Sequence, residues 1–517
     1  MIYTSHHPVP PLPKTSVFHY LFPERPGDSP IHVHPPSTPA FIDGPTGRVL
    51  TRGELEDGAL RIATGLRDLG IQGTALLIGP NSLDWVLAAY GLQAAGVTPS
   101  EIAYQYDNSG SSILIADPVL LPAIEEARKL FKNPLKQVLV LRRAPGYKSI
   151  HDIKGPRGKA ERIDDVHQTA WLCYSSGTTG LPKGVMTSHY NMTCELQAVT
   201  VAYPKLTEKD RILGVLPLSH MYGLALLLQQ PLIIGVPVVL YPKFEERPVL
   251  AGIERYRVSY AMFVPPIVLV LYHSAIAKEY DLTSLTRVNC GAAPMSDELC
   301  YAFEAKFPHC EISQGWGLTE SSVAIGYNGA ETGPKSCVGR LLPTWEARLV
   351  KDGKDVAPGE EGEIWARSPA LMEGYHDNPK ATADCMDGDW FKTGDVGRID
   401  EDGFIYIVDR VKELIKYKGY QVAPAELEAL LLQCPGVKDA GVVGVYSEAQ
   451  ATELPRAYVV ADASPDFIAE WVKERVSNPK RLRGGVVLVN SIPKSPSGKI
   501  LRKDLRTRAA QEMKAKL

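Results

Sequence analysis

The stretch YSSGTTGLPKG at residues 174–184 places many hydrogen-bond donors where there is little side-chain bulk. Its hydroxyl groups belong to Ser175, Ser176, Thr178 and Thr179, and Lys183 adds a positive charge. The glycines allow backbone N–H groups to approach an anion closely, so the composition predicts a loop that cradles phosphate. The loop lacks the Walker pattern because its lysine lies between proline and glycine. Taken alone, such a loop is also typical of a flexible turn.

The elements around this loop follow an α/β pattern. Residues 50–70 space their apolar side chains along one helical face, with Thr51 as the expected cap and Glu54 three positions later. Short apolar runs at 74–79, 112–117, 136–141 and 170–174 indicate buried strands. The loop therefore follows a buried strand, and a helix is expected to begin near His189.

The sequence pattern changes near residue 336, from alternating helices and strands to short strands. Short alternating strands with glycine turns indicate a β-rich module, and residues 397–410 indicate a hairpin that turns at Asp402 and Gly403. Beyond it, a helix opening at Pro424, strands at 440–446 and 456–462 and a helix at 465–476 predict a small α+β unit. The joint between the two parts is expected between Asp409 and Lys412.

Composition excludes several classes of protein. A chain of 517 residues is too long for one core to be the default, so at least two domains are expected. The net charge of −3 gives no electrostatic footprint for nucleic acid or an anionic membrane. The eight cysteines form no CxxC pair, so neither a zinc site nor a disulfide framework is indicated, which fits a reducing compartment.

The segment 223–241 is the most apolar of the chain, but glutamines and prolines divide it in the middle. It is interpreted as a buried helix followed by a buried strand, not as a membrane span. The N-terminus has no apolar signal core, so export is not expected. The final residues, AKL, are close to the S-K-L address of peroxisomal proteins; a solvated tail is the alternative, so the location is peroxisomal or cytoplasmic.

Read as a whole, YSSGTTGLPKGV closely resembles the signature of the adenylate-forming superfamily, which includes acyl-CoA synthetases, beetle luciferases and peptide-synthetase adenylation domains. Other stretches agree in order and spacing along essentially the full chain. They are LPLSHMYGL (216–224), CGAAPMSDEL (290–299), QGWGLTES (314–321), YHDNP (375–379), the stretch 390–431 and IPKSPSGKILRKDLR (492–506). The resemblance is nearest to 4-coumarate:CoA ligase and its relatives.

The resemblance implies both a fold and an activity. The fold is α/β, with a large N-terminal domain (1–411) of two α/β subdomains and a small β-barrel-like module, followed by a small mobile α+β C-terminal domain (412–517). The activity is that of an ATP-dependent acid:CoA ligase. Such an enzyme activates a carboxylic acid to an acyl-adenylate with release of pyrophosphate, then transfers the acyl group to CoA. Mg²⁺ is the implied cofactor, with ATP and CoA as co-substrates.

Joining a carboxylate to the α-phosphate of ATP brings two anions together, so cations and N–H groups must suppress their repulsion. The resemblance implies that Glu320 holds Mg²⁺, that Thr319 contacts phosphate and that Asp395 and Arg410 hold the ribose. Trp316 replaces the usual Tyr or Phe and offers the adenine a similar flat face. The full implied nucleotide set is Ser175, Ser176, Gly177, Thr178, Thr179, Gly180, Lys183, Gly291, Ala292, Ala293, Gln314, Gly315, Trp316, Gly317, Thr319, Asp395, Arg410, Lys412 and Lys499.

Two half-reactions need two arrangements around one bound adenylate. The resemblance implies that Lys499 bridges the carboxylate and phosphate in the first and that His220 borders the acyl carboxylate. The small domain then swings about the hinge Lys412, so that Lys499 departs and the loop KYKGY (416–420) enters, with Lys416 and the backbone around Lys418 lining a tunnel for pantetheine. The implied CoA contacts are Lys243, Lys418 and Gly419. The basic run KRLRGG (480–485) is left open between a CoA contact and a solvated turn.

The acid is less well defined by the sequence. The positions that line the acyl pocket in related ligases are His220, Tyr222, Leu226, Ala293, Gly315, Val323 and Tyr327. Their mix of aromatic and small side chains suits an aryl or arylalkenoic acid, and a medium-chain fatty acid is the alternative because apolar pockets discriminate weakly by shape. The stretch SHMYGLALLL offers no carboxylate for the α-amino group of an amino acid.

Two remote readings remain. One is luciferase-like oxidation of the adenylate, which shares the first half-reaction. The other is a catalytically impaired member that only binds nucleotide, suggested by stretches after Gly96 that look shorter than in the family. That shortening threatens packing more than chemistry, because it lies away from the stretches that carry the catalytic residues.

Overall fold

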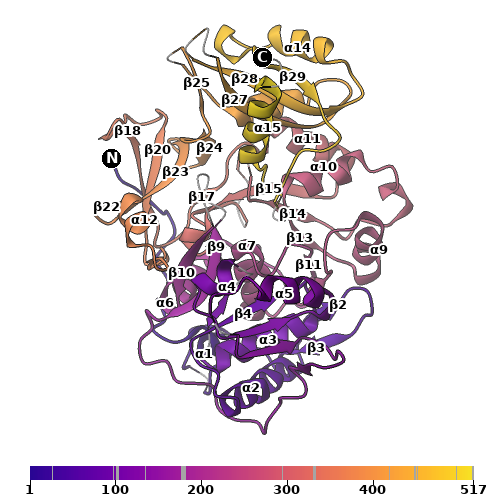
Figure 1. Ribbon diagram of the computed structural model, residues 1–517, viewed down its shortest axis with the longest axis vertical. Coiled ribbons are helices and arrows are strands. Elements are labelled where there is room, and N and C mark those ends of the chain that lie inside the picture. Colours follow the sequence, from indigo (N-terminus) through magenta and orange to yellow (C-terminus); the bar gives the residue numbers. More distant parts are fainter. Residues whose placement is uncertain are drawn as a thin grey trace.

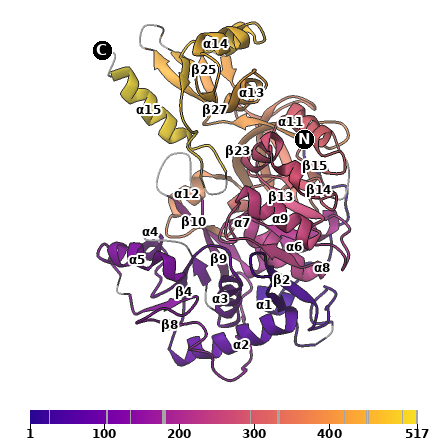
Figure 2. The same ribbon diagram turned by 90° about the vertical axis from the view of Figure 1, so that its right-hand side faces the viewer.

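A large N-terminal part carries a small C-terminal unit at one end (Figures 1 and 2), as expected. The computed structural model describes residues 1–25, 27–96, 98–100, 104–133, 135–175, 182–293, 295–329, 333–418, 420–447, 450, 452–495 and 498–514. The boundary between residues 411 and 412 stays a prediction. No helix among these residues is long and apolar enough to cross a membrane.

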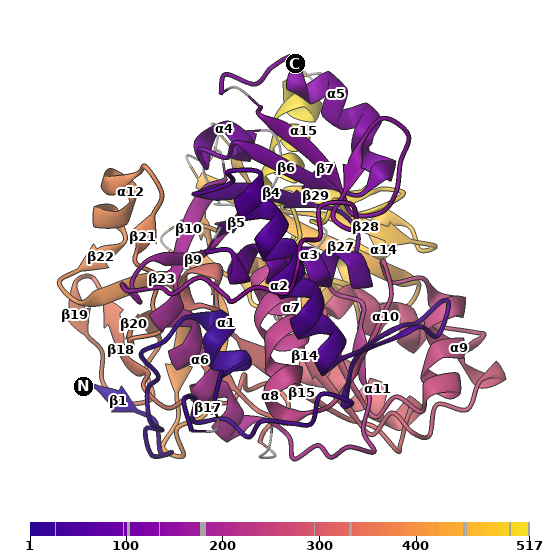
Figure 3. The ribbon, with the colours of Figure 1, turned by 90° about the horizontal axis from the view of Figure 1, so that it is seen from below.

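The first layer is a five-stranded parallel sheet in the order β5-β4-β6-β7-β8. Its elements are α2 (Arg52–Asp68), β4 (Thr74–Ile78), α3 (Leu83–Ala94), β5 (Thr98–Ser100), α4 (Tyr104–Asn108), β6 (Ile113–Ala116), η1 (Pro118–Leu120), α5 (Leu121–Arg128), β7 (Gln137–Val140) and β8 (Lys148–Ser149). Helices α4 and α5 pack on one face through Tyr106 and Ile124 (Figure 3). The capping box of Thr51 and Glu54 at the start of α2 is confirmed.

The second layer is a nine-stranded sheet in the order β17-β16-β15-β14-β13-β11-β12-β2-β3. Its strands are β2 (Pro39–Asp43), β3 (Val49–Thr51), β11 (Ile212–Gly214), β12 (Val238–Leu240), β13 (Tyr260–Phe263), β14 (Arg287–Cys290), β15 (Glu311–Trp316), β16 (Gly326–Tyr327) and β17 (Arg340–Leu341). The central strands from β2 to β15 pair in parallel, so their carboxyl ends share one edge. Ligands of open α/β sheets bind at this edge.

Helices pack around this sheet. They are α1 (Val17–Leu21), α6 (His189–Ala202), α7 (Met221–Gly223), the π-helical turn η2 (Leu224–Gln229), α8 (Gln230–Ile234), α9 (Glu246–Tyr256), α10 (Pro265–His273), η3 (Ala277–Glu279), α11 (Asp297–Lys306) and η4 (Thr319–Ser321). The apolar segment 223–241 is a buried helical stretch followed by the buried strand β12, as expected.

The stretch that contains the predicted phosphate loop begins and ends in two paired strands. Strand β9 (Thr169–Ser175) pairs antiparallel with β10 (Lys183–Ser188), which also pairs with β21 (Gly374–Tyr375). The sequence predicted β9 and the helix start at His189, where Ser188 caps α6, but it did not predict β10. The loop residues Ser176, Gly177, Thr178, Thr179 and Gly180 lie outside the described residues.

The β-rich module is an antiparallel sheet with the strand path β1-β18-β20-β23-β22, in which β24 pairs with β23. Over the described strands this path is open and does not close into a barrel. Its elements are β1 (Tyr3–Thr4), β18 (Glu346–Lys351), β19 (Lys354–Asp355), β20 (Gly362–Arg367), α12 (Pro379–Asp384), β22 (Met386–Asp387), β23 (Trp390–Ile399) and β24 (Ile405–Arg410). The hairpin of β23 and β24 with its turn at Asp402 and Gly403 is confirmed.

The C-terminal unit has a hydrophobic core of its own, built from residues between Ile415 and Leu482. Its elements are β25 (Ile415–Tyr417), β26 (Tyr420–Val422), α13 (Pro424–Leu431), β27 (Val437–Ser447), β28 (Thr452–Ala461), α14 (Pro465–Lys473), η6 (Asn478–Lys480), β29 (Gly485–Leu488) and α15 (Arg502–Lys514). The helix opening at Pro424 is confirmed, although it ends at Leu431 and is therefore short. Separate cores allow the two parts to move relative to each other as bodies.

Candidate functional site

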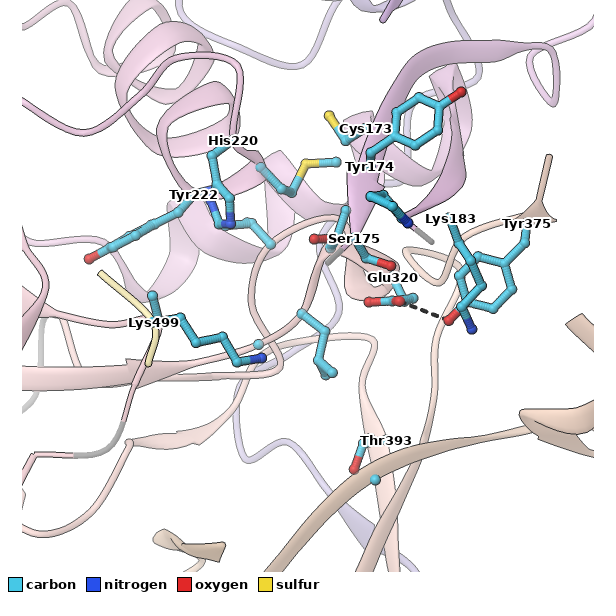
Figure 4. Close-up of a pocket in the computed structure, with 18 of the residues that line it drawn as sticks. Cys173, Tyr174, Ser175, Lys183, His220, Tyr222, Glu320, Tyr375, Thr393 and Lys499 are labelled. Carbon is cyan, nitrogen blue, oxygen red and sulfur yellow. Dashed lines mark hydrogen bonds between the residues drawn. The ribbon is translucent and has the colours of Figure 1, made fainter. Parts of the chain in front are cut away.

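A cavity of about 1060 Å³ lies at the carboxyl edge of the nine-stranded sheet. Three segments that follow parallel strands reach it: Pro217–Leu226 after β11, Gly291 and Ala292 after β14, and Gly317–Glu320 after β15. The β9–β10 hairpin and the β-rich module form further walls, and Lys499 enters from the C-terminal unit (Figure 4). The sequence stretches that could do chemistry therefore converge on one site.

The predicted phosphate end of the cavity carries a lysine and a carboxylate on either side of one tyrosine (Figure 4). The Nζ atom of Lys183 lies 4.1 Å from the centre of the Tyr375 ring. The Tyr375 hydroxyl donates a hydrogen bond of 2.8 Å to Oε1 of Glu320. Burial and the Glu320 charge raise the pKa of Tyr375, so its hydroxyl stays protonated and donating. The ring thus fixes the carboxylate that is predicted to hold Mg²⁺.

Tyr375 was given no role by the sequence analysis, although the stretch YHDNP begins with it. Ser175 and Thr319 also line the cavity, as the resemblance implies.

The predicted adenosine end is organised by Asp395, which is 3% exposed. Its Oδ1 pairs with Nε of Arg410 at 2.8 Å, and its Oδ2 accepts the indole N–H of Trp316 at 2.8 Å. Trp316, Arg410 and Lys412 line the cavity, as do Thr393 and Gly394, whereas Asp395, the next residue along the chain, does not. Each carboxylate oxygen has a second lone pair, so the protein contacts leave acceptor capacity for hydroxyl groups.

Lys499 reaches the cavity from the segment before α15, and its side chain extends into the space that His220 and Glu320 also line (Figure 4). Burial and the Arg410 guanidinium lower the pKa of Lys499 to about 8, while Glu413, Asp395 and Glu320 oppose this shift. The lysine is therefore charged at neutral pH. Among the described residues that follow Lys412, the predicted hinge, only Ser495 and Lys499 line the cavity.

His220 caps the start of α7 and faces the same space. Its Nδ1 accepts the backbone N–H of Tyr222 at 3.3 Å. Burial, and next the charge of Lys499, lower the pKa of His220 to about 4, so the ring is neutral at pH 7. Because Nδ1 is the acceptor, the ring proton belongs on Nε2, which can donate to a carboxylate.

The predicted acyl end is closed by aromatic rings and small residues. Leu226, Gly315 and Val323 line it together with two tyrosines. The hydroxyl of Tyr222 lies 3.2 Å from Oδ1 of Asn289, and the hydroxyl of Tyr327 lies 2.6 Å from that of Tyr260. Asn289 was not predicted to line the cavity; as a buried polar side chain at the end of β14 it could have been considered. This end is thus largely apolar, with a few hydroxyl and amide groups.

A carboxyl group that the sequence analysis missed supports this wall. Glu195, in the middle of α6, has no exposed surface and accepts the backbone N–H of Ala324 at 2.9 Å and the indole N–H of Trp345 at 3.2 Å. Burial raises its pKa to about 8. Ser322 and Val323, next to Ala324, have positive φ angles of 58° and 145°. Glu195 therefore holds an unusual backbone segment behind the acyl end.

Several predicted site residues lie elsewhere. Ala293 and Gln314 do not line the cavity; the Gln314 side chain accepts the backbone N–H of Met295 and donates to the carbonyl oxygen of Lys335. Lys243 lines a second cavity of about 460 Å³ and pairs with Glu245 at 2.8 Å. Lys416 and Lys418 are exposed on the C-terminal unit, and Gly419 lies outside the described residues. The roles given to these residues stay predictions.

Comparisons with known proteins agree with this geometry. The family model described as AMP-binding enzyme matches residues 31–376, and that of the AMP-binding enzyme C-terminal domain matches residues 426–499. The peroxisomal OPC-8:0-CoA ligase 1 of Arabidopsis thaliana is 38% identical, with 90% of each chain covered. The 4-coumarate–CoA ligase 2 of Nicotiana tabacum is 37% identical, with 92% of each chain covered.

Comparison with solved structures also finds CoA ligases. The anthranilate CoA ligase AuaEII, in complex with anthranoyl-AMP, superposes with a TM-score of 0.86 at 25% identity and covers 97% of this chain and 98% of its own. The o-succinylbenzoate coenzyme A synthetase MenE of Bacillus subtilis, in complex with ATP and magnesium ion, has a TM-score of 0.76 at 27% identity, with 91% and 97% covered. The chain therefore belongs to the AMP-binding enzyme family, as an AMP-forming acyl-CoA ligase.

Proposed function

We propose that the protein activates an aryl or arylalkenoic acid and transfers it to CoA through an acyl-adenylate. The observation that carries this proposal is one cavity in which Lys499, His220 and Glu320 converge next to an end closed by aromatic rings. Ring-lined, mostly apolar walls favour a flat acid, because offset or edge contacts between rings add to simple burial. A medium-chain fatty acid is the second candidate.

In the first half-reaction a carboxylate oxygen attacks the α-phosphorus of ATP, and the bond to the β-phosphate breaks to release pyrophosphate. The Lys499 ammonium bridges carboxylate and phosphate oxygens and reduces their repulsion. The Nε2–H group of His220 donates to the acid, which holds the carboxylate beside the α-phosphate. Asp395 and Arg410 hold the ribose, Trp316 covers the adenine, and Ser175 and Lys183 meet the terminal phosphates.

Glu320 is the proposed protein ligand of Mg²⁺. Its Oε1 is oriented by Tyr375 and its side chain reaches the cavity, so one carboxylate faces the space for the phosphates. One carboxylate together with substrate phosphates is a usual donor set for Mg²⁺. When bound, the ion neutralises charge on the phosphates. The similarity to MenE, whose structure is a complex with ATP and magnesium ion, supports this assignment.

In the second half-reaction the thiolate of CoA attacks the acyl carbon, and the bond to AMP breaks. We propose that the unit 412–517 turns about Lys412 for this step, so that Lys499 leaves, and Lys416 on strand β25 and Lys418 directly after it approach. Separate hydrophobic cores on either side of Lys412 support such a movement. Lys243 and the second cavity next to it are proposed to meet the phosphates of CoA.

The acid class is tested by supplying ATP, Mg²⁺ and CoA with matched acids and identifying the thioesters by mass. We expect kcat/KM for benzoic and cinnamic acids to exceed that for hexanoic and octanoic acids by about tenfold or more, a difference of about 1.4 kcal/mol in transition-state binding. The opposite ranking would favour the fatty-acid reading. Light emission with luciferin and ATP but no CoA would instead support luciferase-like chemistry.

We also propose that the protein is imported into peroxisomes through its terminal AKL residues, which lie outside the described residues. The relative from Arabidopsis thaliana is named as peroxisomal, which supports the idea. Deleting residues 515–517 from a fusion with an N-terminal fluorescent protein should move fluorescence from peroxisomes to the cytosol. Ligase activity serves as the control and should be unchanged. Peroxisomal fluorescence after the deletion would contradict the proposal.

A further inference from the structure

The hairpin of β25 and β26 is held at its tip by the first two residues of β28. The Thr452 hydroxyl donates to the carbonyl oxygen of Lys416 at 2.8 Å and accepts the backbone N–H of Lys418 at 2.7 Å. A carboxylate oxygen of Glu453 accepts the backbone N–H of Lys416 at 2.7 Å. Thr452 is 6% exposed, although both lysines whose backbone it contacts have exposed side chains.

The hairpin cannot satisfy these backbone groups by itself. Tyr417 pairs with Tyr420, so the turn between them contains two residues and begins at Lys418. Lys418 has a φ of 46°, a conformation that L-residues rarely adopt and that favours glycine or asparagine. Its N–H group and the outward-facing groups of Lys416 therefore need partners from another element. One hydroxyl, with both a donor and an acceptor function, joins the carbonyl group of Lys416 to the N–H group of Lys418 on the β25 side of the turn.

This contact bears on the second half-reaction, not the first. Lys416 and Lys418 do not line the cavity in the present arrangement, in which Lys499 occupies it. Under the proposed function the same turn must later meet the acyl-adenylate and the thiol. A turn that relaxed during the domain movement would deliver its N–H groups and Lys416 to the wrong place, and a misplacement of about 1 Å can cost a factor of about 100.

We propose that Thr452 is a positioning residue for thioester formation: its hydroxyl locks the Lys416–Lys418 turn so that it moves as a rigid part of the C-terminal unit. This inference rests on the proposed role of that turn. Glu453 assists by fixing the N–H group of Lys416. Neither side chain touches the cavity, so neither contributes to adenylation.

The test compares Thr452→Val, which keeps the shape and lacks the hydroxyl, with Thr452→Ser, which keeps the hydroxyl. Adenylation is measured by pyrophosphate exchange, and thioester formation is measured with supplied benzoyl-adenylate and CoA. We expect Thr452→Val to slow thioester formation by about tenfold, since a lost buried hydrogen bond is of that order, with pyrophosphate exchange within about twofold of wild type. Thr452→Ser should behave like wild type in both assays.

A Thr452→Val enzyme that forms thioester at the wild-type rate would overturn the inference, and so would an equal loss in both half-reactions, because that pattern marks a purely structural role. If Thr452→Val does not fold by circular dichroism, Thr452→Ala takes its place with the same expectation. Failure of the underlying function is distinguishable: it would appear as wild-type enzyme that forms no thioester from benzoyl-adenylate.

Discussion

Replacing Lys499 by alanine is expected to slow acyl-adenylate formation by about 100- to 1000-fold, the usual effect of removing one group that stabilises transition-state charge. Lys499 is the cation that the C-terminal unit places in the cavity beside His220 and Glu320. Pyrophosphate exchange with a supplied acid measures this step directly. Lys503→Ala, which removes an exposed lysine of α15, is the matched control and should leave exchange unchanged.

The same variant should retain thioester formation from supplied acyl-adenylate and CoA, since the proposed second arrangement has no place for Lys499. Equal losses in both half-reactions would contradict the division of roles. A pH profile gives a second readout. The pKa of Lys499 is lowered to about 8, so the ammonium is present below this pH and is lost above it. For wild type, kcat/KM for ATP should therefore decline above pH 8, and the residual activity of Lys499→Ala should lack this decline.

Lys416→Ala is expected to have the reverse effect, slowing thioester formation by about 100-fold and leaving pyrophosphate exchange within about twofold of wild type. Lys416 is exposed on β25 and lies outside the cavity that Lys499 occupies, so its removal cannot disturb the groups placed for adenylation. Lys438→Ala, at an exposed ion pair with Asp462 on the same unit, is the control. Thioester formation at the wild-type rate would remove Lys416 from the mechanism.

Local signals predicted where many elements begin. The capping pair of Thr51 and Glu54 marked the start of α2, and Pro424 marked the start of α13, because the groups that stabilise a helix start lie within one turn of it. The family resemblance also predicted residues of the site. Lys183, His220, Thr319 and Lys499 all line the cavity. Short motifs therefore predicted both the elements and many of the residues that meet at the site.

What the sequence did not reveal depends on contacts between distant segments. Strand β10 contains glycine and lysine, so its sequence resembles a continuation of the loop. It is a strand because it pairs with β9. The bond between Trp316 and Asp395 joins residues 79 positions apart. Glu195 reads as an ordinary helical glutamate, and only the fold brings Ala324 and Trp345 to its two oxygens. Nothing in local spacing encodes such partners.

The cavity takes one wall from a body that has its own core, because Lys499 belongs to the C-terminal unit. Under the proposed movement of that unit, shelter from water is a temporary property of the site. The acyl-adenylate proposed to form there would be screened from water while the C-terminal unit stays in place and exposed when that unit leaves. On this proposal the timing of the domain movement sets the lifetime of the intermediate, so an acceptor that arrives late competes with hydrolysis as well as with other acceptors.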